Sequence, residues 1–234
     1  MLLFLEQVLN GLQLGVMLFL LAAGLTLVFG IMNLINLAHG SLYMIGAYVA
    51  ATVTGLSGSF LLGLLAALPA AALVGMAMEI VVLRHLYDRD HLDQVLATFG
   101  LIMLFNELTR ILWGRQPLFL DIPPWLAGTV EIIPGAPYPA YRLAIIGVGI
   151  LVAVFLYLLI TRTRLGMQIR AGATNREMIG ALGVNIRWLY TLVFGLGALL
   201  AGLAGAMAGP AEAQAVPEVK PLEVGAVAPE FALP

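Results

Sequence analysis

Cysteine is absent from the 234-residue chain, and charged residues are scarce, at 10% of the sequence. A chain without cysteine can form no disulfide, no thiolate metal site and no cysteine nucleophile. Lys220 is the only lysine, so the other members of the Lys+Arg set are arginines. The formal net charge of -2 gives no electrostatic argument for nucleic-acid binding, and no nucleic-acid partner is expected.

Catalytic and phosphate-binding motifs are also missing. The sequence contains no Ser/His/Asp grouping and no Walker phosphate loop, and His85 and His91 carry no metal-ligand spacing. We therefore predict no catalytic residue, no metal site and no cofactor. The chain is predicted not to be an enzyme, and it has no evident means of hydrolysing ATP itself.

Apolar residues make up 62% of the chain. Soluble domains carry about 25% charged residues, so a soluble chain this apolar would lack the polar residues needed to cover its surface. A lipid bilayer solvates apolar side chains directly. The N-terminus has no basic segment and its first charge is Glu6, so we expect the first apolar stretch to be a retained helix and not a cleaved signal.

A membrane-spanning helix needs about 20 mainly apolar residues. Five stretches meet this length: Val8–Gly30, Phe60–Leu83, Val95–Trp113, Leu143–Ile160 and Trp188–Gly209. A sixth, Leu42–Gly55, is shorter and rich in small residues. It either spans together with the Leu37–Ser41 approach or is a re-entrant or broken helix buried among its neighbours.

Arginine placement predicts the orientation. Arg84 and Arg89 lie in one connection, and five arginines lie in the segment Thr161–Arg187. Because consecutive spans alternate in direction, both connections face one side, which the positive-inside rule makes cytoplasmic. The proline-rich connection Gly114–Arg142 then faces outward. The N-terminus lies outside if the sixth segment spans and inside if it is re-entrant.

The segment Thr161–Arg187 is basic and amphipathic. Asn175 or Thr174 is expected to cap a short helix over Arg176–Leu182, which ends at Gly183. One interpretation is a docking lever that passes motion from a partner to the two helices it joins. The alternative is a basic loop that holds the topology and touches anionic lipid.

A polar cluster interrupts the apolar sequence in GIMNLINLAHGSLYMIGAY, where Asn33, Asn36 and His39 precede a short helix. Such a pattern indicates a helix break, whose free N–H groups and positive dipole end suit a carboxylate. A satisfied polar cluster that closes a turn at the membrane surface fits the residues as well.

Ionisable residues within apolar stretches often mark a transport pathway. Glu107 and Arg110 are one turn apart near the outer end of their span, where they are expected to pair and reach the interface. Glu79 lies one turn inside Arg84, and the same interfacial role is expected for it. Two GxxxG pairs, Gly11–Gly15 and Gly205–Gly209, predict a tight bundle or a dimer face.

Two segments resemble the branched-chain amino-acid ABC transporter permeases of the high-affinity Leu/Ile/Val type. GLTLVFGIMNLINLAHGSLYMIGAY resembles their first signature, and TRTRLGMQIRAGATNREMIGALGVNIRWLYTLVFGLGALLAGLAGAMAG resembles their cytoplasmic coupling loop and following helix. The resemblance implies a multi-pass subunit in the lipid bilayer of the bacterial cytoplasmic (inner) membrane. The implied partners are a second permease subunit, two cytoplasmic ATP-binding subunits and a periplasmic solute-binding protein.

The resemblance also assigns roles to residues. It implies a coupling loop over residues 161–187, centred on Gly166, Arg170, Ala171, Asn175, Arg176, Ala181, Gly183 and Asn185. It implies translocation-pathway candidates at Asn33, Asn36, His39, Gly40 and Gly46.

The expected fold is all-α: a polytopic transmembrane helix bundle with about six spans, one of them short or re-entrant, plus a cytoplasmic coupling helix. Residues 1–209 are expected to form the transmembrane permease domain. Residues 210–234 are predicted to be a disordered Pro/Ala/Glu-rich tail that is atypical for the family, as in a truncated or frame-shifted product.

The predicted function is that of a membrane-spanning permease subunit of an ABC importer. It would translocate branched-chain or other hydrophobic amino acids, driven by ATPase subunits. Two alternatives remain: a secondary transporter or channel for small polar solutes such as urea or amides, and a truncated inactive remnant or membrane scaffold.

Overall fold

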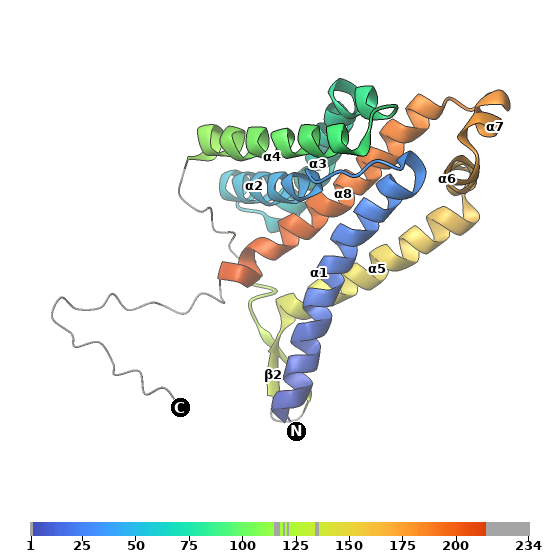
Figure 1. The fold of residues 1–234 in the computed structure, drawn as a ribbon. Helices are drawn as coiled ribbons and strands as arrows, with labels where there is room; N and C mark the ends of the chain where they lie inside the picture. Colours follow the sequence, from blue (N-terminus) through green and yellow to red (C-terminus); the bar gives the residue numbers. More distant parts are fainter. Residues whose placement is uncertain (1, 115–117, 119, 121, 134–135, 214–234) are drawn as a thin grey trace, which may run out of the picture.

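A computed structural model describes residues 2–114, 118, 120, 122–133 and 136–213 (Figure 1). Most described residues belong to helices: α1 (Leu2–Met32), α2 (His39–Ser57), α3 (Phe60–Val81), η1 (Leu83–Leu86), α4 (His91–Trp113), α5 (Ala140–Arg162), α6 (Arg164–Thr174), α7 (Arg176–Ala181) and α8 (Ile186–Ala213). Among the described residues, five helices are long and apolar enough to cross a membrane, namely α1, α3, α4, α5 and α8. The predicted all-α polytopic bundle is confirmed.

Helix α8 is the central element of the bundle. Its most apolar window is 83% buried, whereas the corresponding windows of α1, α3, α4 and α5 are 22–28% buried. A helix can bury its whole circumference only when other helices surround it. Figure 1 shows α8 passing between α1 on one side and α2 and α3 on the other, and it contacts all three.

Small residues bring α8 close to its neighbours. A Cβ atom at Gly46 of α2 would overlap the backbone of Gly202, and one at Gly205 would overlap the carbonyl of Tyr43. Close approach of this kind replaces hydrophobic burial as the driving force for helix packing in a membrane. The tight bundle predicted from glycine content is therefore present around α8. The pair Gly11 and Gly15 on α1 has no atom within 4 Å of either Cβ position.

The two ends of the bundle are identified by side-chain contacts. At one end, the Tyr87 hydroxyl after η1 contacts Sδ of Met32, the last residue of α1, at 3.9 Å. We call this the arginine-rich end, because η1 and α6–α7 lie there. At the other end, Oδ1 of Asn10 accepts hydrogen bonds from Tyr138 (3.0 Å) and Arg142 (2.6 Å). We call this the hairpin end.

Helix α2 crosses from the arginine-rich end to the hairpin end. It is continuous from His39 to Ser57 and starts beside the end of α1. Near its C-terminus, Oγ1 of Thr52 accepts a hydrogen bond of 2.7 Å from Nε1 of Trp113, the last residue of α4. The chain leaving α2 reaches Phe60, whose ring packs edge-on against Tyr141 at the start of α5, next to the hairpin, with centroids 5.9 Å apart. The two ends of α2 therefore lie at opposite ends of the bundle, which is the geometry of the spanning arrangement, although α2 is not among the five helices that qualify as spans by length and composition.

A two-stranded antiparallel hairpin, β1 (Thr129–Ile133) and β2 (Ala136–Pro139), precedes α5. Val130 pairs with Tyr138 in it, and both are residue types that favour strands. No strand was predicted from the sequence in this connection. At the C-terminal side, α8 continues to Ala213, so the first residues of the predicted tail are helical. Residues 214–234, which hold the rest of that tail, lie outside the described residues.

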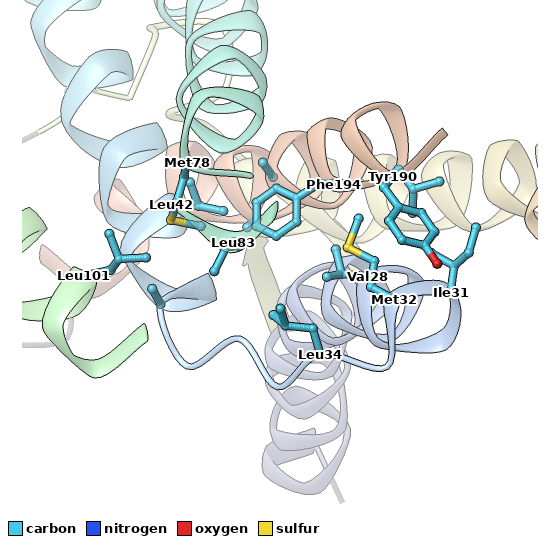
Figure 2. Packing of buried hydrophobic residues seen from close by; sticks show 14 of the residues in the cluster. Val28, Ile31, Met32, Leu34, Leu42, Met78, Leu83, Leu101, Tyr190 and Phe194 are labelled. Atoms are coloured by element: carbon cyan, nitrogen blue, oxygen red, sulfur yellow. The ribbon is translucent and has the colours of Figure 1, made fainter. Parts of the chain in front are cut away.

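The largest apolar cluster lies toward the arginine-rich end. Figure 2 shows Leu42 of α2, Met78 of α3, Leu83 of η1 and Phe194 of α8 packed together, with Leu101 of α4 at the edge. Leu42, Leu83 and Phe194 have no exposed surface. The cluster includes Met78 and Tyr190, the sequence neighbours of the buried polar residues Glu79 and Thr191.

Candidate coupling loop and pathway residues

The coupling loop (residues 161–187) begins with a sharp turn between α5 and α6. Oγ1 of Thr163 accepts a hydrogen bond of 3.1 Å from the amide of Gly166, which caps the start of α6. A Cβ atom at Gly166 would overlap the carbonyl oxygens of Leu159 and Ile160. Glycine is therefore required where the chain doubles back, and its predicted importance has a local steric reason.

Helix α7 has the cap and the stop that the sequence predicts. Oδ1 of Asn175 accepts a hydrogen bond of 3.0 Å from the amide of Met178. At the other end, Gly183 has φ 88°, its amide donates to Gly180 (3.0 Å), and the amide of Val184 donates to Ile179 (3.3 Å). This pair of bonds is a Schellman motif, which favours glycine at the left-handed position. The predicted cap at Asn175 and the predicted end at Gly183 are confirmed.

The predicted coupling residues divide into one buried and several exposed positions. Gly166 is buried, whereas the others are exposed: Arg170, Ala171, Asn175, Arg176, Ala181, Gly183 and Asn185. Asn185 begins the connection to the core, since its Oδ1 accepts a hydrogen bond of 3.1 Å from the amide of Trp188 in α8. The loop therefore presents a continuous surface between α5 and α8.

An apolar groove of about 310 Å³ lies on this surface, between α6 and the end of α7. Met167, Ile179, Leu182 and Val184 line it, with Arg164 at its edge. The side chains of Leu182 and Met167 are 75% and 57% exposed. Large apolar side chains gathered on an otherwise charged segment indicate a contact surface for another molecule.

The asparagines of the pathway signature shape the connection between α1 and α2. Asn33 is exposed and ends α1 in the left-handed conformation, with φ 53° and its amide bonded to Phe29 at 2.9 Å. Asparagine tolerates this conformation better than other residues with a side chain. Asn36 is 3% exposed, and its Oδ1 accepts a hydrogen bond of 3.0 Å from the amide of Ala38. Its Nδ2 has no hydrogen-bond partner among the described residues.

His39, the first residue of α2, lies where three helices meet. It is 3% exposed, and a Cβ atom on Gly24 of α1 would lie 3.0 Å from its Nε2 and 2.6 Å from the carbonyl oxygen of Gly197 of α8. Gly46 lies about two turns further along the same helix, against Gly202. Gly40 is exposed and has no neighbour within 4 Å of its Cβ position. The structure thus brings Asn36, His39 and Gly46 into the interior, whereas Asn33 and Gly40 lie at the surface.

Glu79 corrects an expectation from the sequence. Its carboxylate was expected at the membrane interface, but the residue has no exposed surface. Arg84 Nε and Nη2 donate to it at 3.3 Å and 3.2 Å, the Tyr87 hydroxyl at 2.5 Å, and the Thr191 hydroxyl at 2.6 Å. Burial, together with the hydrogen bond to Glu79, raises the pKa of Tyr87, so its hydroxyl stays protonated and donates.

The burial of Glu79 does not follow from the sequence, because its partners are not all local. Arg84 and Tyr87 follow Glu79 closely, but Thr191 is 112 residues away. The other predicted pair behaves as expected, since Arg110 Nη1 lies 3.3 Å from Glu107 Oε2 and both side chains are more than half exposed.

Comparison with known proteins identifies the family. The family described as "Branched-chain amino acid transport system / permease component" matches residues 7–227. The permease protein BraD of the high-affinity branched-chain amino acid transport system of Pseudomonas aeruginosa is 33% identical over 211 residues, which cover 85% of this chain and 68% of BraD. The corresponding LivH of Salmonella typhimurium is 31% identical over 210 residues, with the same coverage.

A more distant relative is named for a different cargo. The ribose import permease RbsC of Escherichia coli K12 is 26% identical over 188 residues, which cover 78% of this chain and 54% of RbsC. No solved structure matches the chain. The match over residues 7–227, together with the relatives that are 31–33% identical, shows that the chain belongs to the family of permease components of branched-chain amino acid transport systems.

Proposed function

We propose that this chain is the membrane-spanning permease subunit of an ABC importer that carries branched-chain or other hydrophobic amino acids across the bacterial cytoplasmic membrane. The observation that carries the proposal is the family match over residues 7–227 of a chain whose described helices are long enough to cross a membrane. Its partners would be a second permease subunit, two cytoplasmic ATP-binding subunits and a periplasmic solute-binding protein. The family match does not favour a secondary transporter or channel.

The arginine-rich end would face the cytoplasm. Arg84 lies in η1 and Arg89 shortly after it. Arg164, Arg170 and Arg176 lie in α6 and α7 at the same end of the bundle. Positive residues in short connections are retained on the cytoplasmic side. The hairpin end, where Asn10 and Arg142 meet, would then face the periplasm and receive solute from the binding protein.

The coupling loop would receive the ATP-binding subunit at the apolar groove of α6 and α7. Apolar side chains of the partner would fill the groove beside Met167 and Leu182, while acidic side chains of the partner would pair with exposed arginines such as Arg170. Because the loop joins α5 directly to α8, a displacement of α7 acts on α8, which contacts α1, α2 and α3.

The solute pathway would pass the start of α2. The free N–H groups at a helix N-terminus favour a carboxylate, and the unpaired Nδ2 of Asn36 adds a donor beside them. His39 would supply a further polar contact, while the surrounding apolar residues would accept an aliphatic side chain. Asn33 and Gly40 would act only by shaping the connection into α2.

The proposal is tested by reconstituting the complete complex into proteoliposomes. With ATP and the loaded binding protein, we expect labelled leucine to accumulate, and urea to be excluded. ATP-binding subunits that bind but cannot hydrolyse ATP serve as the matched control and should stop uptake. Uptake at the wild-type rate without nucleotide would refute the importer. Uptake driven by an ion gradient alone would instead identify a secondary transporter.

A further inference from the structure

A closed polar triangle joins α3 to α8 at the arginine-rich end. Thr191 of α8 donates to Oε2 of Glu79 at 2.6 Å and accepts from Nη2 of Arg84 at 2.9 Å. Nη2 of Arg84 in turn lies 3.2 Å from Oε2 of Glu79. Each of the three side chains therefore contacts the other two. The triangle ties α3, the connection after it and α8 to one another.

The triangle lies directly beside the coupling loop. Thr191 lies in the second turn of α8, which starts at Ile186, within the last residues of the coupling loop. Tyr87, which also donates to Glu79, packs its ring edge-on against Tyr190 with centroids 5.2 Å apart. Helix α7 itself packs against α8. Contacts thus lead from α7 to α8, and from Tyr190 of α8 through Tyr87 to Glu79.

The surroundings make the triangle resistant to opening. Met78, Leu83 and Phe194, which lie next to these side chains in the sequence or one turn away, belong to the large apolar cluster (Figure 2), and Glu79 has no exposed surface. Removing one partner of a buried ion pair leaves an uncompensated charge, which is strongly unfavourable. Hydrogen bonds are also directional, whereas apolar contacts are not. Sliding of α8 along α3 at this level is therefore opposed more strongly than sliding of two apolar surfaces.

We propose that Glu79 is a positioning residue for energy coupling: it makes the inner ends of α3 and α8, with the connection after α3, move as one body when the ATP-binding subunits displace the coupling loop. This inference rests on the proposed function. Glu79 touches neither solute nor nucleotide in this role. It acts by transmitting the displacement of α7 through Thr191 to α3.

Thr191→Val tests the triangle with the least disturbance, because valine has nearly the same shape as threonine and lacks only the hydroxyl. In the reconstituted complex we expect the amount of leucine imported per ATP hydrolysed to fall roughly tenfold, as for the loss of a hydrogen bond to a charged group. Thr191→Ser keeps the hydroxyl and should retain coupling. Glu107→Gln, in the exposed pair, is the matched control for losing a carboxylate and should also retain it.

An engineered cross-link provides an independent readout, because the chain contains no cysteine. A Cβ atom at Gly195 of α8 lies 2.8 Å from Cγ of Met76 of α3, so Met76→Cys with Gly195→Cys places two thiols within reach of a disulfide. If α3 and α8 move together, oxidation of this pair should leave wild-type transport unchanged. In the Thr191→Val background, oxidation should restore the import per ATP.

Three results would overturn the inference: normal coupling in Thr191→Val, loss of transport on cross-linking the otherwise wild-type complex, or a cross-linked Thr191→Val that stays uncoupled. Even if Thr191→Val fails to assemble, transport by the cross-linked, otherwise wild-type complex tests whether α3 and α8 move together. Failure of the proposed function is a different result, namely wild-type uptake that consumes no ATP. Wild-type uptake that consumes ATP, combined with any of the three results, rejects only the role proposed for Glu79.

Discussion

Gly24 of α1 and Gly197 of α8 meet backbone to backbone, so that a Cβ atom on Gly197 would lie 2.8 Å from the carbonyl oxygen of Gly24. Neither position has room for a side chain. His39 lies against the same crossing, because its Nε2 is 3.0 Å from the Cβ position of Gly24. This contact sets the separation of α1 from α8 and, with it, the position of the start of α2.

Gly24→Val should therefore push α1 and α8 apart. We expect a loss of about 1–3 kcal/mol in stability, typical of an overpacked core. Gly15→Val on the same helix is the matched control, because nothing lies within 4 Å of its Cβ position. Thermal unfolding of the two purified variants in detergent measures the difference. Equal melting temperatures would contradict the close crossing.

Gly183→Val should impair coupling without affecting membrane insertion. Gly183 has φ 88°, and a β-branched residue held in that region costs about 1–3 kcal/mol. The Schellman end of α7 would rearrange, so ATP-driven uptake should fall while the protein is still found in the membrane fraction. Gly183→Asn, which tolerates the left-handed region, should retain most activity. Wild-type uptake by the valine variant would count against transmission of motion by the coupling loop.

Asn175→Ala should loosen α7 without changing the rest of the fold. The variant loses the cap on Met178 at a cost of about 1 kcal/mol, which is large for a helix that runs only from Arg176 to Ala181. Hydrogen exchange of the α7 amides should become faster, while exchange in α8 stays unchanged. Asn175→Asp keeps an oxygen acceptor and should protect α7 as well as the wild-type residue does. Unchanged exchange in the alanine variant would show that the cap is unimportant.

His39→Leu separates a pathway role from a packing role. Leucine fills the same space between α1, α2 and α8 but offers no polar atom. If His39 contacts the solute, the KM for leucine uptake should rise roughly tenfold, as for a lost polar contact, while the melting temperature is maintained. Asn33→Gly, which preserves the left-handed end of α1, serves as the control and should transport normally. Normal uptake by His39→Leu would assign the residue to packing alone.

Single cysteines test the orientation, since the native chain has none. Trp125→Cys lies in the connection before the hairpin, and Met178→Cys lies in α7, with both native side chains 63% exposed. A maleimide that cannot cross the inner membrane should label only Trp125→Cys in cells with a permeabilised outer membrane. Labelling of Met178→Cys from outside would reverse the orientation and remove the coupling loop from the cytoplasm.

Features that depend on neighbouring residues were predictable. The five long apolar stretches, the cap at Asn175 and the end of α7 at Gly183 all follow from local composition and local hydrogen bonding. The sequence left open whether α2 spans, because Leu42–Gly55 is short and rich in small residues. The opposite placement of the two ends of α2 follows from the contact of Phe60 with Tyr141, which are far apart in the sequence.

Apolar run length and arginine placement are enough to establish a multi-pass membrane protein, since a bilayer admits only a few arrangements of backbone and charge. The burial of Glu79 and the contact of Gly24 with Gly197 depend instead on which helices become neighbours. A carboxylate one turn from an arginine looks the same in the sequence whether it faces lipid headgroups or another helix. Its surroundings arise only when α8 packs against α3 and brings Thr191 to within 2.6 Å of it.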